Sequence, residues 1–157
     1  RLFAGKRAFR VAYVGKGKME EELEEQARQS AHKEVFLFPG QRDDMPAVYN
    51  AADALIVSSF KEGFSNAVVE ALACGKPVIA SDVGGNKEAV SDARYGWIHD
   101  PGDGEALAAQ IVEACEKGRD GLAAMAKDCR NRAEDFSLEA LVRQTHELYC
   151  RALGWEP

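Results

Sequence analysis

The sequence lacks any apolar run long enough to cross a bilayer, which takes about 20 consecutive apolar residues. Its first residues lack the apolar core of a secretory signal peptide, so we expect no direct membrane insertion by this domain. The sequence does not begin with Met, so we expect it to be an excised piece of a longer protein. It also lacks an excess of positive charge. The net charge of −6 disfavours binding to nucleic acid or to anionic membranes.

The sequence lacks paired-cysteine motifs. None of the four cysteines, Cys74, Cys115, Cys129 and Cys150, belongs to a C-x-x-C motif. Each lies in an apolar helical pattern, where a free thiol behaves as a small hydrophobic side chain. His146 and Cys150 could share a helix face, but two ligands do not make a zinc site. We therefore expect neither disulfides nor zinc, and a cytoplasmic location.

Internal repeats and low-complexity segments are also absent, and no stretch has the composition of a linker. The 157 residues fit one domain, and 46% apolar with 29% charged residues is typical of a globular chain. We therefore predict a single domain over residues 1–157.

Short apolar runs alternate with longer amphipathic stretches over the first two thirds of the chain. The expected strands are Arg10–Val14, Val35–Phe38, Ala54–Val57, Val78–Ser81 and Trp97–Ile98. The expected helices are Met19–Ser30, Met45–Ala52, Ser65–Cys74, Gly104–Lys117, Gly121–Arg132 and Leu138–Leu153. Apolar strands that alternate with helices favour a parallel sheet with right-handed crossovers. The predicted fold class is α/β, a Rossmann-like doubly wound parallel sheet with C-terminal helices.

Ligands bind such sheets outside the carboxyl ends of the strands. The loops expected there are Gly15–Lys18, Pro39–Asp43, Ser58–Asn66 and Ser81–Glu88. The functional residues should therefore lie in these four segments.

The helix expected from Ser65 to Cys74 is apolar nearly all round. Its strongly polar residues, Asn66 and Glu70, are four positions apart and share one edge, and Glu62 lies just before its start. Such an edge can bind a ligand, because the first turn offers unpaired N–H groups to phosphate and carboxylates accept hydrogen bonds from hydroxyls. The alternative is that Glu70 marks only the solvated side of the helix.

Glu62 and Glu70 form an E-x7-E pattern, which alone occurs often by chance. Here it continues into E-A-L-A-C-G-K-P-V-I-A and then into G-G-x-x-E, which ends at Glu88. The whole stretch resembles the donor-binding, C-terminal domain of the retaining family 4 (group 1) glycosyltransferases, which have the GT-B fold. Further similar segments are Val14–Gly17, Phe38–Gly40, Tyr49–Asp53 and Asp100–Asp103.

The resemblance implies a hexosyl-type enzyme domain that binds a nucleoside-diphosphate sugar and transfers the sugar with retention to a hydroxyl acceptor, in glycan or glycolipid biosynthesis. It implies no cofactor and no metal in the site. It also implies an acceptor-binding N-terminal domain, which this sequence lacks together with the family's upstream phosphate-binding Arg and Lys. We therefore expect the chain alone to be inactive. The alternative is a non-catalytic nucleotide-sugar-binding or regulatory domain on the same fold.

The resemblance also assigns roles to individual residues. Glu62 is the catalytic residue, placed near the reacting centre as an orienting and charge-stabilising group. Glu70 holds the ribose hydroxyls. The other implied donor-binding residues are Gly15 and Gly17 for close backbone approach, Gln41 and Arg42 beside the base, and Gly63, Phe64, Ser65 and Asn66 at the sugar and diphosphate.

Overall fold

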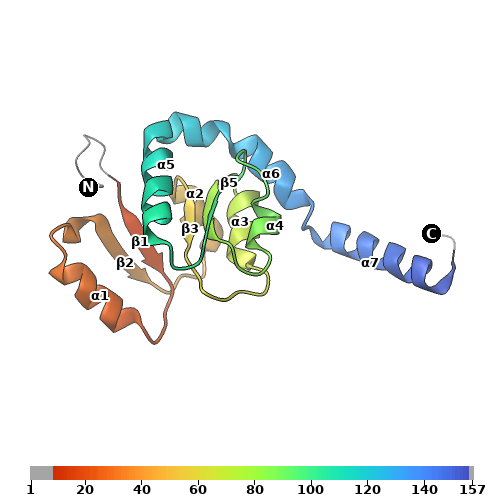
Figure 1. Ribbon diagram of the computed structural model, residues 1–157, viewed down its shortest axis with the longest axis horizontal. Coiled ribbons are helices and arrows are strands. Elements are labelled where there is room, and N and C mark those ends of the chain that lie inside the picture. The colour runs from red at the N-terminus through yellow and green to blue at the C-terminus, as the bar shows by residue number, and fades with distance from the viewer. Residues whose placement is uncertain (1–8, 156–157) are drawn as a thin grey trace. The chain divides into compact units, whose positions relative to one another are not determined.

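The computed structural model describes residues 9–155, in two compact units that divide after Val48 (Figure 1). The first unit contains strand β1 (Val11–Val14), helix α1 (Glu20–Gln29), a short 3-10 helix (Lys33–Val35) and strand β2 (Phe36–Gly40). β1 and β2 pair in parallel, with Val11 opposite Phe36. Tyr13 stacks on Phe38 across the pair, with ring centroids 5.2 Å apart. This unit is therefore a β-α-β element, as expected.

The second unit is built on a three-stranded parallel sheet. Its strands are β3 (Leu55–Val57), β4 (Val78–Ser81) and β5 (Gly96–His99), in the order β3-β4-β5. All four residues of the central strand β4 are buried. The crossovers include helices α3 (Asn66–Ala73) and α4 (Asn86–Ala89), and helix α2 (Met45–Ala51) precedes β3. The predicted α/β class with parallel strands is confirmed, although β1 and β2 form a separate sheet.

Three helices follow the sheet: α5 (Gly104–Ala124), α6 (Ala126–Glu134) and α7 (Leu138–Leu153). α5 covers one side of the sheet and α3 and α4 lie on the other (Figure 1). Beneath α5, Ile79 packs with Ala114 and Leu122. Capping bonds fix the starts of α5 and α7, because the Ala106 amide donates to Asp103 at 2.9 Å and the Ala140 amide to Ser137 at 3.1 Å.

Several boundaries differ from the sequence prediction. Strand β2 continues through Pro39 and Gly40, which the prediction placed in the loop Pro39–Asp43. The segment predicted as the loop Ser81–Glu88 contains the start of α4, which the prediction missed because a four-residue helix has no apolar period to detect. The helix predicted over Gly121–Arg132 is divided between two helices, since α5 continues to Ala124 with only Gly118 outside helical geometry and α6 begins at Ala126. The glycine at 118 takes a φ of 66°, so the predicted interruption between residues 117 and 121 is real.

All four cysteines are free thiols in the structure. Cys129 on α6 is fully buried, and burial raises its pKa to about 11. The reactive thiolate is therefore scarce at neutral pH. We expect iodoacetamide at pH 8 to modify Cys129 at least about tenfold more slowly than the half-buried Cys74 and Cys115, as measured by peptide mass spectrometry. Equal rates at the three thiols would contradict the packing of α6.

Candidate functional site

Glu62 lies in the loop between β3 and α3, where the ends of two strands hold it. The Ser59 hydroxyl donates a hydrogen bond to Oε1 of Glu62 at 2.8 Å. The hydroxyl of Ser81, fully buried at the end of β4, donates to the Ser59 carbonyl at 2.6 Å. Asn86 extends this chain, because its side-chain amide donates to the Ser81 carbonyl at 3.2 Å. The half-buried carboxylate of Glu62 is thus oriented by residues at the carboxyl ends of β3 and β4.

The residues after Glu62 lead into the N-terminus of α3. Ser65 is the N-cap residue and is 7% exposed, whereas Gly63, Phe64 and Asn66 are exposed. Within residues 9–155, the Ser65 hydroxyl makes no capping hydrogen bond. The Val68 amide donates to the Ser65 carbonyl at 3.1 Å, so the amides of Asn66 and Ala67 at the start of α3 are the ones suited to an anionic oxygen from outside the chain.

Glu70 lies one turn into α3, on its exposed edge. The hydroxyl of Tyr49 in α2 donates to Oε2 of Glu70 at 2.9 Å, and Tyr49 itself is buried. Burial, followed by the hydrogen bond to Glu70, raises the pKa of Tyr49 far above its ordinary value, so the phenol stays protonated and donating. An ionised carboxylate has about four acceptor positions, and this bond uses one of them. Glu70 can therefore still accept bonds from a vicinal diol.

Tyr49 orients Glu70, and the sequence assigns it no role. It stands in the segment Tyr49–Asp53, which contributes to the resemblance, but no role was attached to it. Its partner lies 21 residues away in another helix, and no periodicity connects them. The sequence therefore gives no local signal that Tyr49 contacts Glu70.

The Gly84-Gly85 pair packs against the loop that contains Glu62, Gly63 and Phe64. The Gly85 amide donates to the Gly63 carbonyl at 2.8 Å. A Cβ atom at Gly84 would overlap the Gly63 carbonyl, and one at Gly85 would overlap the Phe64 ring. Glycine at both positions is therefore what allows this close approach, and Gly84 also takes a positive φ of 53°.

Four predicted donor-site residues belong to the first unit. Gly15 has a φ of 132° and its amide donates to the Gly40 carbonyl at 3.0 Å. No described heavy atom lies within 4 Å of a Cβ built at Gly15 or Gly17, so the backbone there is open to approach. Arg42, exposed like Gln41, forms a two-pronged ion pair with Asp44 at 2.8 and 2.7 Å. Their place in a donor site stays a prediction.

Other kinds of site find little support in the described part of the chain. No group of three His, Cys, Asp or Glu side chains there could hold a metal ion. No helix within residues 9–155 has both the length and the apolar character needed to cross a membrane. Two shallow hollows, one beside α1 and β2 and one on α7, involve none of the predicted donor-site residues.

Comparison with known proteins gives consistent matches. The family model described as "Glycosyl transferases group 1" matches residues 2–117. The chain is 37% identical over 120 residues to D-inositol 3-phosphate glycosyltransferase of Salinispora tropica, a match that covers 76% of this chain and 24% of that protein. It is 36% identical over 107 residues to O-antigen chain mannosyltransferase B of Escherichia coli, covering 68% and 27%. The chain thus spans about a quarter of the length of these relatives.

A solved structure also matches. HepE from Anabaena, in complex with UDP, superposes with a TM-score of 0.78 at 27% identity, covering 91% of this chain and 41% of HepE. The same protein in complex with UDP-glucose gives a TM-score of 0.76 at 28% identity and covers 90% and 41%. The Rossmann-like α/β fold predicted from the alternation of strands and helices is therefore confirmed.

Proposed function

Because the chain belongs to the group 1 glycosyltransferases, we propose that it binds a nucleoside-diphosphate sugar and takes part in transferring that sugar to a hydroxyl acceptor. Family membership confirms the resemblance carried by the E-x7-E stretch. The observation that carries the proposal is the pair of hydroxyl-held carboxylates at α3. Ser59 orients Glu62 just before the helix, and Tyr49 orients Glu70 one turn into it.

Each part of the donor has a suitable group at α3. The diphosphate would accept hydrogen bonds from the first-turn amides and gain from the positive end of the helix dipole. Glu70 would accept hydrogen bonds from the two ribose hydroxyls. Glu62 would lie beside the sugar, where its negative charge favours the positive charge that develops as the bond to the diphosphate breaks.

The proposed reaction retains the configuration of the sugar. The bond between the anomeric carbon and the diphosphate oxygen breaks, and the acceptor oxygen bonds to the same face of that carbon. The acceptor proton passes to an oxygen of the leaving diphosphate. Glu62 then orients and stabilises charge without bonding to the sugar, and the amides of α3 perform the charge stabilisation that a metal ion supplies in other transferases.

The relatives narrow the proposed substrates. HepE is described in complex with UDP and UDP-glucose, which favours a uridine donor with a hexose. The names of two relatives indicate D-inositol 3-phosphate and an O-antigen chain as their substrates, which favours a hydroxyl acceptor in glycan or glycolipid synthesis. We propose that an acceptor-binding domain, as the missing partner, completes the enzyme and that the reaction takes place in the cytoplasm.

The first experiment is a ligand-observed NMR screen of this chain against UDP, GDP, ADP and TDP. We expect UDP to bind selectively. We expect Glu70→Ala to weaken UDP binding by about ten- to a hundredfold, because a charged hydrogen bond contributes about 1.5–3 kcal/mol. Tyr49→Phe should weaken binding less, by about threefold, because it keeps the carboxylate and removes only the group that orients it.

Glu113→Ala is the matched control for this screen, since it removes an exposed carboxylate from α5. It should leave UDP binding unchanged. Binding by Glu70→Ala that equals that of the unchanged chain would overturn the ribose assignment. Failure of every nucleotide to bind, both to this chain and to the full-length gene product, would count against the proposed function as a whole.

A further inference from the structure

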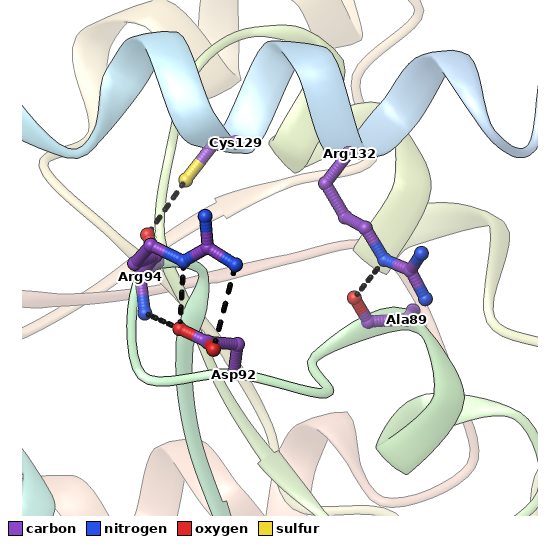
Figure 2. Close-up of polar contacts among 5 residues, drawn as sticks. All are labelled: Ala89, Asp92, Arg94, Cys129 and Arg132. Atoms are coloured by element: carbon purple, nitrogen blue, oxygen red, sulfur yellow. Dashed lines mark hydrogen bonds and ion pairs between the residues drawn. The ribbon is translucent and has the colours of Figure 1, made fainter.

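Arg132 on α6 holds the C-terminal end of α4. Its Nε donates to the Ala89 carbonyl at 3.1 Å (Figure 2). Its Nη2 donates to the Glu88 carbonyl. These two carbonyls are the last of a short helix, so no later N–H group of that helix donates to them. The Arg132 side chain is only 18% exposed, and its Nη1 also pairs with Asp135 at 2.7 Å. The guanidinium is therefore held on several sides.

The same guanidinium begins a stack that reaches the Glu62 loop. Its Cζ lies 4.7 Å from the ring centroid of Phe136, the second residue after α6. The Phe136 ring packs against the Phe64 ring, with centroids 5.1 Å apart and planes at 48°. Phe64 in turn covers the backbone of Gly85, the N-cap residue of α4. Cation–π and tilted aromatic contacts of this kind are favourable beyond the area they bury.

These contacts close a ring around α4. Arg132 binds the C-terminal end of α4, the N-cap Gly85 meets Phe64, and Phe64 returns through Phe136 to Arg132. The ring includes Phe64, which stands two residues after Glu62 and immediately before Ser65. A shift of Phe136 would therefore move the backbone on which the proposed sugar and diphosphate contacts depend.

We propose that Arg132 and Phe136 are positioning residues, which hold the 62–65 loop in its ligand-binding conformation through Phe64. This inference rests on the proposed function, because the ligand of the loop is the nucleotide sugar. Gly63 and Phe64 are exposed, so a loop without this support would sample other conformations. Ordering that loop when the donor binds would cost conformational entropy and so weaken the affinity for the donor. Glu70 stands outside the ring and keeps its own orienting bond from Tyr49.

The test measures loop support and ligand binding separately, in Phe136→Leu and Arg132→Met. The Gly85 amide reports on the loop without any ligand, because it donates to the Gly63 carbonyl. We expect its hydrogen exchange to speed up by about tenfold or more in both variants. We also expect the affinity for UDP-glucose to fall by about tenfold while the affinity for UDP, bound mainly through Glu70, falls by about threefold or less.

Two further variants separate positioning from general stability. Phe136→Tyr keeps the ring and should behave as the unchanged chain. Cys129→Ala removes a buried side chain of α6 whose Sγ contacts the Arg94 carbonyl, so it should lower the melting temperature and leave the Gly85 exchange and the binding ratio unchanged.

The outcomes distinguish this inference from the proposed function. An unchanged Gly85 exchange rate in Phe136→Leu and Arg132→Met would overturn the positioning role whether or not a ligand binds. Equal losses of UDP and UDP-glucose affinity would overturn a positioning role at the sugar, because the loss would then come from the diphosphate contacts that both ligands share. Faster exchange in a chain that binds no nucleotide sugar would support the mechanical link and refute only the proposed function.

Discussion

The Glu62→Gln variant is expected to transfer sugar about a hundredfold more slowly than the unchanged protein while binding UDP within about twofold of it. The substitution keeps the oxygen that accepts the Ser59 hydrogen bond, so the loop should retain its geometry. It removes only the negative charge. A charge that acts on the developing positive centre of the sugar matters far more in the transition state than in the bound donor, so the loss should fall on kcat.

The assay uses the full-length gene product, because the chain spans about a quarter of its relatives. The rate of UDP release from UDP-glucose in the presence of an acceptor measures transfer, and a binding titration with UDP measures the nucleotide contact. Glu113→Gln serves as the matched control, since it neutralises an exposed carboxylate on α5. A Glu62→Gln protein with a normal rate would remove Glu62 from the mechanism. Parallel losses of rate and UDP affinity would make its role structural.

The order of strands and helices could be predicted because burial leaves a clear trace in the sequence. β4 is buried at every residue, so it appears as the unbroken apolar run Val78–Ser81 and was placed without error. The predictions for α3 and α7 are also close, since α3 has a nearly all-apolar pattern and α7 follows the N-cap Ser137. α4 has neither signal, because Gly85 offers no capping side chain and the helix ends after one turn.

The candidate site could be predicted only in part, for a related reason. Glu62, Ser65 and Glu70 lie within nine residues of the chain, so their spacing alone predicts that they lie near one another around one helix. No such spacing connects them with Tyr49 or Arg132. Tyr49 precedes Glu70 by 21 residues, and Arg132 follows Ala89 by 43. Contacts of this separation depend on how whole elements pack, which no local period encodes.

Gly96→Ala is expected to destabilise the second unit by about 3 kcal/mol, which lowers its folding equilibrium constant by roughly a hundredfold. Gly96 has a φ of 145°, a conformation that side chains rarely adopt, and a Cβ built there would overlap the Val78 carbonyl oxygen. Gly96 and Val78 lie opposite each other at the start of the β4–β5 pair. Neither backbone can yield without losing ladder hydrogen bonds, so the strain cannot be relieved locally.

Urea unfolding followed by circular dichroism measures this effect, with Gly104→Ala as the control. No described heavy atom lies within 4 Å of a Cβ at Gly104, the first residue of α5, so alanine there should leave the urea midpoint unchanged or raise it slightly. Equal midpoints for Gly96→Ala and the unchanged chain would contradict the register of β5.

Weakening β5 also has a consequence for the candidate site. The Asp82 amide donates to the His99 carbonyl of β5 at 2.7 Å, so weakening β5 also frees the end of β4, where Ser81 holds the Ser59 carbonyl and, through it, the Glu62 loop.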